Sequence, residues 1–288
     1  MNTKARQMVR FGLLAGFLAL ASQPASAALK IIPVFIGGDP PPATNVIGGG
    51  NLQEIFQVAA ESWERVFKRG GGNWTVTIYY GWTNGLPIEF ATTTENGLYA
   101  QEKLIAEGGN PVRMTHSLVY FNNAPPLDST FQNLFMDPTP RDNRKYLRYT
   151  TERQEVDVAP PQHSVDVAPQ QLNIGRVLSE NPGTENSLDV LSLCLHEIGH
   201  SLGLDSAYSG FRAQFTGLVR VTAPRPYVGM FIAINNGPHT WFDSSLMVQF
   251  QTVAGLRPLI SAADALLIAQ LNSFDNPDLD GLPWETNP

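Results

Sequence analysis

The chain has 288 residues, of which 43% are hydrophobic and 16% are charged, a balance typical of a folded globular protein. This composition excludes a disordered, collagen-like or coiled-coil protein. The formal net charge of −7 argues against a nucleic-acid-binding protein, because a phosphate backbone would be repelled. The 25 glycines and 22 prolines favour short elements joined by many loops over a helical bundle.

The first 27 residues differ from the rest of the chain. Basic residues precede an apolar run at 11–20, and a group of small residues follows it. This order is typical of a secretory signal peptide, and the apolar run is about half the roughly 20 residues that a transmembrane helix needs. We therefore predict cleavage after Ala27 or Ala28, which leaves residues 28–288 as a single secreted or periplasmic domain with no membrane contact.

The chain contains one cysteine, Cys194, so an intramolecular disulfide cannot form in spite of the predicted export. Cys194 lies in the apolar run 191–195, where we expect a buried, unreactive thiol. The stability of the fold must then come from its core or from a metal.

The first predicted elements follow from local patterns. Residues 51–68 place apolar side chains at three- and four-residue spacing behind a candidate N-cap, Asn51, which predicts an amphipathic helix. Residues 74–80 predict a strand, and residues 112–121 predict a second one. The segment 122–171 is rich in proline and polar residues, so we interpret it as a long ordered loop or an edge structure near a cleft.

The most informative motif is His-Glu-Ile-Gly-His, on a predicted helix capped by Asn186 or Ser187. Four-residue spacing puts His196 and His200 on one face of this helix, so both imidazoles can bind one Zn²⁺. The Glu197 carboxylate lies beside them and can take a proton from a water on the metal without being a ligand itself. The motif therefore predicts metal-assisted hydrolysis.

Together with Gly203, where the helix can end and the chain can turn back, this motif resembles the active-site helix of the metzincin clan of zinc endopeptidases. The compact metzincin signature has a third histidine three residues after the glycine, where this chain has Ser206. Asp205, one residue earlier, is one candidate for the third ligand. It could instead accept a hydrogen bond from a zinc-bound imidazole, or be an ordinary polar residue after the helix.

A second segment, 237–247, resembles the region of leishmanolysin-like metzincins in which a remote third histidine, followed closely by tryptophan, precedes the methionine of the Met-turn. This resemblance implies that His239 is the third zinc ligand and that Met247 is the Met-turn residue. By themselves, His239 could be a surface-loop histidine and Met247 an ordinary core residue. His116 and His163 are the remaining candidate ligands.

The resemblance implies an α+β fold of the metzincin zincin type, with a mixed twisted sheet, an active-site helix and a Met-turn. The upper half would end near residue 203, the less regular lower half would cover 204–274, and a substrate cleft would run between them. Some bacterial secreted metalloproteases of the same clan, which have a helix similar to residues 56–63 ahead of a strand, are also similar to this chain.

The last part of the domain combines a helix with an acidic tail. Residues 261–271 predict a helix that begins with a capping box of Ser261 and Asp264. The tail at 275–288 has acidic residues at alternate positions but lacks the final glutamate of a calcium loop. We therefore expect a solvated acidic tail rather than a Ca²⁺ site.

We expect a monomeric, secreted zinc endopeptidase that acts on protein or peptide substrates with Glu197 as the general base; peptide-bond cleavage is implied by the resemblance alone. Tyr208 and Tyr227 are candidates for the group that stabilises the transition state. The contrasting hypothesis is a non-catalytic adhesin or binding protein with a structural zinc. Glu197 argues against it, because a structural site is closed by a fourth protein ligand and needs no adjacent carboxylate.

Overall fold

The computed structural model describes residues 28–68, 72–84, 100–124, 132–139, 146–156, 170–180, 184–214, 217–235, 237–249, 254–280 and 282. The predicted signal peptide and His163 lie outside these residues. No helix in the described part of the chain is long and apolar enough to cross a membrane.

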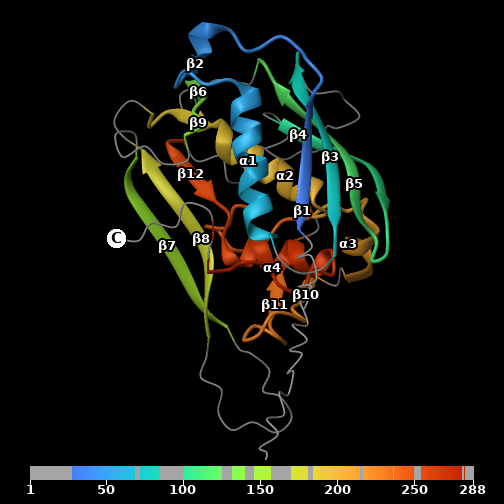
Figure 1. Cartoon of the computed structure of the whole chain (residues 1–288). Coiled ribbons are helices and arrows are strands. Elements are labelled where there is room, and N and C mark those ends of the chain that lie inside the picture. Colours follow the sequence, from blue (N-terminus) through green and yellow to red (C-terminus); the bar gives the residue numbers. More distant parts are fainter. Residues whose placement is uncertain are drawn as a thin grey trace, which may run out of the picture.

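The described residues form a mixed α+β fold with few helices (Figure 1). The helices are α1 (Leu52–Val66), α2 (Val190–Ser201), α3 (Ser209–Gln214) and α4 (Ala262–Leu271). The longer strands are β1 (Leu29–Phe35), β3 (Trp74–Thr83), β4 (Ala100–Gly108), β5 (Arg113–Asn122), β7 (Tyr146–Val156) and β8 (Gln170–Glu180). The shorter strands are β2 (Val46–Ile47), β6 (Asn133–Phe135), β9 (Ser187–Asp189), β10 (Leu218–Arg220), β11 (Phe231–Ala233) and β12 (Leu256–Leu259). The predicted α+β class is confirmed.

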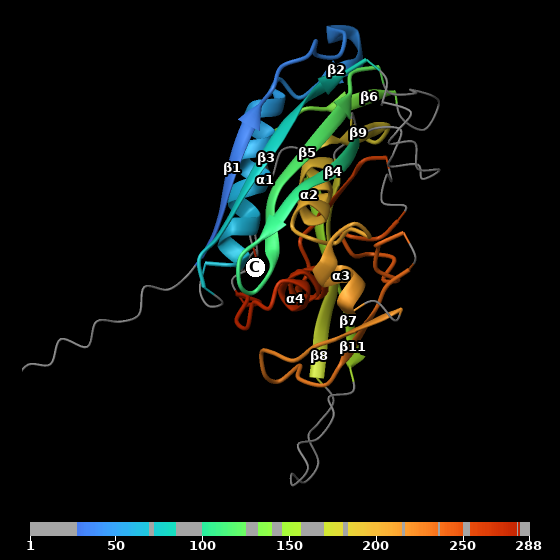
Figure 2. The ribbon, with the colours of Figure 1, turned by 90° about the vertical axis from the view of Figure 1, so that its right-hand side faces the viewer.

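A four-stranded mixed sheet, in the order β1-β3-β5-β4, forms one layer of the fold. Its first three strands are parallel, and β4 is antiparallel at one edge. Helix α1 packs against β1, α2 packs against β4 and β5, and the two helices contact each other, so both cover the same face (Figures 1 and 2). The helix predicted at 51–68 and the strands predicted at 74–80 and 112–121 are thereby confirmed as α1, β3 and β5.

A second sheet, in the order β12-β8-β7, is antiparallel throughout and packs against α4. Its strand β7 lies at an edge, so the interpretation of 122–171 as an edge structure is confirmed for these residues, whereas the interpretation as a long loop is wrong for them. The pairing of β8 with β12 also crosses the boundary that we expected near residue 203. The two expected halves therefore do not correspond to separate sheets.

Helix α2 begins later than the sequence predicted. Its N-cap is Asp189, whose carboxylate accepts hydrogen bonds from the backbone N–H of Ser192 at 2.8 Å and from the Arg257 guanidinium at 2.7 Å. The prediction of Asn186 or Ser187 as the cap is wrong, because Ser187–Asp189 forms strand β9 and pairs with β6. This small sheet leads the chain directly into α2.

The C-terminal prediction is confirmed: α4 begins with the capping box of Ser261 and Asp264. In the tail, Asp275 and Asp280 are exposed, while Asp278 pairs with Lys68 near the end of α1. Within the described residues, the acidic side chains of the tail do not gather as a group that could hold a metal.

Candidate metal centre

Every residue of α2 is buried, so this helix lies inside the fold. The indole of Trp63 on α1 donates a hydrogen bond to the Leu195 carbonyl at 2.9 Å and fixes the two helices to each other. His196 and His200 lie one turn apart on α2, and their Nε2 atoms are 3.0 Å apart. The predicted common face of the two imidazoles is therefore confirmed.

His239 joins these two histidines from a distant part of the sequence. Its ring centroid lies 5.4 Å from that of His196 and 4.8 Å from that of His200. One ligand atom from each of the three residues falls within 4.8 Å of the others. His239 is 7% exposed, and its Nδ1 atom is buried without a hydrogen-bond partner. These three imidazoles form a buried group that could hold a metal ion.

Backbone carbonyls orient two of the imidazoles. His196 Nδ1 lies 2.7 Å from the carbonyl oxygen of Leu246, and His200 Nδ1 lies 2.6 Å from that of Leu204. A carbonyl oxygen only accepts, so each Nδ1 carries the proton and donates it. In the neutral ring each Nε2 atom then carries a lone pair and no proton, which is the arrangement found around metal-ligating histidines.

The turn after α2 places one of these carbonyls. Gly203 has a φ of +111°, and a Cβ atom there would lie 2.8 Å from the ring of Tyr208. Its N–H donates to the His200 carbonyl at 2.8 Å, which ends the helix and reverses the chain. The sequence expectation of a turn at Gly203 is confirmed, and the reversal is what brings the Leu204 carbonyl back to the imidazole of His200.

Burial keeps the three imidazoles neutral. It lowers the pKa of His196 to about 3, with a further contribution from His200. Burial also lowers the pKa of His200 and that of His239, and for His239 the two neighbouring imidazoles add to the effect. Metal binding requires the neutral form of histidine, so these side chains are ready to act as ligands near neutral pH.

Glu197 follows His196 directly on α2. The side chain is buried, and burial raises the pKa of Glu197 to about 8. A divalent cation held by the neighbouring histidines would favour the ionised form of this group. Strongly shifted pKa values beside potential metal ligands are typical of functional sites.

Asp205, the alternative third ligand, lies outside the three-histidine group. Its Oδ1 atom accepts a hydrogen bond from the backbone N–H of Ala207 at 2.5 Å. Its carboxylate also hydrogen-bonds with Glu102 on β4, and burial together with this contact raises the pKa of Glu102 well above its ordinary value. Asp205 was also predicted as a possible acceptor for the N–H of a ligand imidazole. This role is wrong for His200, because the Nδ1–H of His200 donates to the Leu204 carbonyl instead.

Met247 belongs to a turn that a single buried carboxylate holds. Asp264 of α4 accepts hydrogen bonds from the backbone N–H of Leu246 at 3.2 Å and from that of Met247 at 3.1 Å. It also accepts one from the hydroxyl of Ser245, which in turn accepts from Thr240 at 2.9 Å, next to His239. Asp264 therefore links α4 to the residues that carry or orient two of the three histidines.

We expect Asp264→Asn to lower both the stability of the fold and the affinity for a divalent metal. The amide would leave buried N–H groups of the turn unsatisfied, at about 1–3 kcal/mol each, and would release the Leu246 carbonyl that orients His196. Ser261→Ala is the matched control, because it removes the helix cap at a cost of about 1 kcal/mol and leaves the turn in place. Urea denaturation and Co²⁺ titration of both variants check this; an unchanged Co²⁺ affinity in Asp264→Asn would contradict it.

The Met247 side chain packs against Gly199, which lies between the two helical histidines in the sequence. A Cβ atom on Gly199 would lie 2.4 Å from the Met247 Sδ atom and 3.3 Å from the Trp63 ring. We expect Gly199→Ala to destabilise the fold by about 1–3 kcal/mol, because the added methyl group would force the fully buried Met247 side chain to shift. In Gly108→Ala, the control, the nearest atom is 3.9 Å away. Equal unfolding midpoints of the two variants in urea would contradict this packing.

The other candidate residues of the sequence have different surroundings. The Tyr208 hydroxyl donates to the Val112 carbonyl at 2.8 Å, and burial raises its pKa, so this side chain has a packing role. Tyr227 packs against the core, and burial raises its pKa. His116 lies on β5, where its ring stacks on Tyr79.

The sequence did not indicate the residues that orient the histidines. Leu204 and Leu246 act through backbone carbonyls, which carry no side-chain signal. Asp264 was recognised as a helix cap, and its contacts with the turn at Met247 follow only from the tertiary structure.

Cys194 is fully buried on α2, and burial raises its pKa well above the ordinary value, which confirms the expected inert thiol.

Comparisons of the chain with protein-family models, with curated proteins and with solved structures find no match.

Proposed function

We propose that this protein is an exported zinc-dependent endopeptidase of the metzincin type. One observation carries the proposal: His239 lies beside His196 and His200, and Glu197 is the next residue on the same helix. A buried group of three neutral imidazoles with a free carboxyl group beside it is the arrangement that metal-assisted hydrolysis needs. The turn at Met247 corresponds in this proposal to the Met-turn of the family.

The chemistry of the ligand atoms favours zinc. Imidazole nitrogen suits Zn²⁺, and catalytic zinc sites have three protein ligands and one position open to water or substrate. His196, His200 and His239 would hold the ion. When bound, Zn²⁺ acidifies a water molecule and polarises the carbonyl of the scissile bond.

Glu197 would transfer the proton. Its carboxylate accepts a proton from the attacking water and then gives it to the amine that leaves. Glu197 is buried on α2 beside a ligand residue, and the positive charge of a bound ion would favour its ionised form, which is the form that accepts the proton. The Leu246 and Leu204 carbonyls keep two of the imidazoles in a fixed orientation during these steps.

The edge strand β4 offers a place for an extended substrate. It ends the four-stranded sheet and packs against α2, so its outer edge lies beside the helix of the metal centre (Figure 2). An extended peptide can add to such an edge through backbone hydrogen bonds, which are largely independent of the peptide sequence. This geometry supports a polypeptide substrate over a small molecule.

Metal removal tests the proposal. We expect a chelator to abolish casein hydrolysis by residues 28–288, and one equivalent of Zn²⁺ to restore it, because the ion is required for the chemical step and is held by three protein ligands. Hydrolysis by protein verified to be metal-free would contradict the proposal. A protein that binds one Zn²⁺ and never cleaves casein or a peptide library would favour the non-catalytic binding protein instead.

A further inference from the structure

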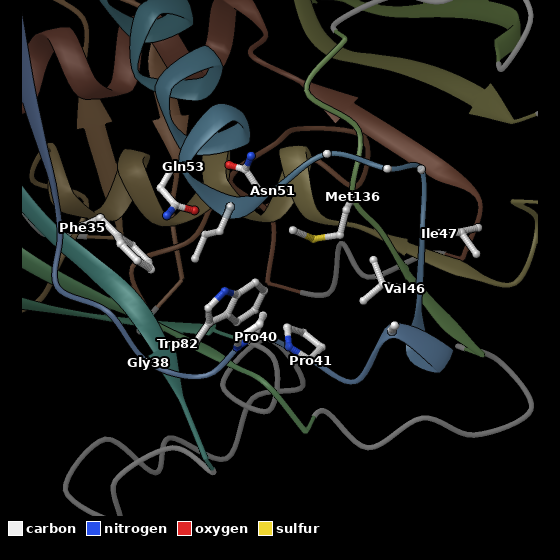
Figure 3. Close-up of a pocket in the computed structure, with 15 residues that line it drawn as sticks. Phe35, Gly38, Pro40, Pro41, Val46, Ile47, Asn51, Gln53, Trp82 and Met136 are labelled. Carbon is white, nitrogen blue, oxygen red and sulfur yellow. The ribbon is translucent and has the colours of Figure 1, made fainter.

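A second site lies at the end of the molecule where β1 and β3 finish and α1 begins (Figure 3). It is a cavity of about 500 Å³, within the range of roughly 300–1,000 Å³ that is usual for small-molecule sites. Trp82, Pro41 and Met136 come from three separate segments and point toward a common space. The three histidines of the metal centre are not among the residues that line it.

The position of the cavity favours a ligand. Strands β1 and β3 are parallel, and the cavity lies beyond their carboxyl ends, next to Phe35 and Trp82. In open sheets with parallel strands, ligands bind outside the carboxyl ends of the strands. The cavity is thus at the place where this kind of sheet commonly binds small molecules.

Backbone hydrogen bonds fix the walls of the cavity. On one side, the N–H of Trp82 donates to the Gly37 carbonyl at 3.0 Å. On the other side, the N–H of Gly50 donates to the Met136 carbonyl at 2.8 Å. A Cβ atom on Gly48 would lie 2.5 Å from that same carbonyl oxygen, so only glycine allows the loop at 48–50 to approach the Met136 backbone this closely. Such a preformed cavity loses little conformational entropy when it binds a ligand.

The lining residues define the class of ligand. None of the 15 residues around the cavity is charged, so a charged group would lose its hydration without gaining a partner. The side-chain polar groups are the indole N–H of Trp82 and the amides of Asn51 and Gln53, and the Asn51 amide oxygen already caps α1 at the N–H of Glu54. Flat apolar surfaces come from Trp82 and from the proline rings, and the Met136 thioether can contact the edge of an aromatic ring.

We propose that this cavity binds a small, neutral, planar aromatic molecule with one hydrogen-bonding substituent, which the Gln53 amide would meet at the rim. The ligand stacks on Trp82 and is shielded by Pro41 and Met136. This site is separate from the metal centre, and its ligand is recognised whether or not the protein is an endopeptidase.

Two probes with the same ring system test the class of ligand. We expect 2-naphthol, which is neutral at pH 7, to bind the full mature chain saturably with one molecule per chain in isothermal titration calorimetry. The anion 2-naphthoate is expected to bind at least about ten-fold more weakly, because the lining offers no charge to pair with it. No saturable binding of 2-naphthol, or equal affinity for the two probes, would overturn the proposal.

Variants that fill the cavity test its location. Ala43 and Val46 both line the cavity, so we expect Ala43→Trp and Val46→Trp each to add a large ring there and to reduce 2-naphthol binding at least about ten-fold. Ile32→Trp is the control, because Ile32 is 43% exposed on β1 and does not line the cavity. Thermal unfolding confirms that the variants are folded. Unchanged binding in a folded Ala43→Trp or Val46→Trp variant would place the probe elsewhere and refute the assignment.

Discussion

His239→Ala is expected to remove bound zinc and hydrolytic activity together. The variant loses one of three imidazoles whose ligand atoms lie within 4.8 Å of one another, and two neutral ligands cannot hold the ion as three do. Changes to residues that only orient a ligand lower metal affinity by about 10–100-fold. Loss of a ligand itself should therefore lower the affinity by more than about 100-fold. Zinc per chain and casein hydrolysis, measured on folded protein, check this expectation.

Asp205→Ala is the matched control for this experiment. Asp205 is close enough to affect His200, but its carboxylate contacts Ala207 and Glu102 rather than the imidazoles. We expect this variant to keep one zinc per chain and to lose less than about ten-fold in activity. A metallated, active His239→Ala beside a metal-free Asp205→Ala would show that the third ligand is the aspartate.

Glu197→Gln is expected to keep zinc and lose catalysis. Glutamine has nearly the same shape as glutamate, and Glu197 is not one of the three metal ligands, so metal binding should be unchanged. Its amide cannot accept the proton of the attacking water, which should lower kcat by about 10²–10⁴-fold with little change in KM. Hydrolysis of a peptide substrate at full zinc occupancy measures both constants.

Glu102→Gln provides the comparison for Glu197→Gln. It removes a neighbouring carboxyl group, on β4, that hydrogen-bonds with Asp205 and interacts electrostatically with Glu197. We expect Glu102→Gln to keep kcat within about ten-fold of the unmodified protein, because the residue transfers no proton in the proposed mechanism. A Glu197→Gln variant that is as active as Glu102→Gln would exclude Glu197 as the general base.

The sequence correctly predicted the helices and strands that depend on residues close together in the chain. The apolar spacing of α1, the alternation of β3 and the capping box of α4 each arise from contacts between residues a few positions apart. The start of α2 was missed because residues 187–189 pair with β6, a contact between distant segments that overrides the local capping preference of Asn186 or Ser187.

Contacts between distant segments were also decisive for the second sheet. Strand β7 lies in a proline-rich and polar segment, and it is a strand because it pairs with β8 along its whole length. The pairing across the expected boundary near residue 203 has the same origin, since β12 completes this sheet from the far end of the chain. Propensities of single segments do not contain such pairings.

The parts of the candidate metal centre that lie close together in the sequence were predictable, and the distant parts were not. His196, Glu197 and His200 follow from one helical motif, whereas His239 followed from a resemblance and is brought to them by the fold. The orientation of the imidazoles depends on two backbone carbonyls and on the contacts of Asp264 with the turn at Met247. These groups have no sequence signature, because any residue supplies a backbone carbonyl.

Anomalous X-ray diffraction from crystals of residues 28–288 grown with zinc would locate the ion and its ligands. We expect one strong zinc peak within about 2.0–2.1 Å of a ring nitrogen of each of His196, His200 and His239. We also expect Glu197 to approach the ion only through a water molecule. A peak bonded to Asp205 in place of His239, or a zinc ion coordinated directly by Glu197, would contradict the proposed three-histidine site.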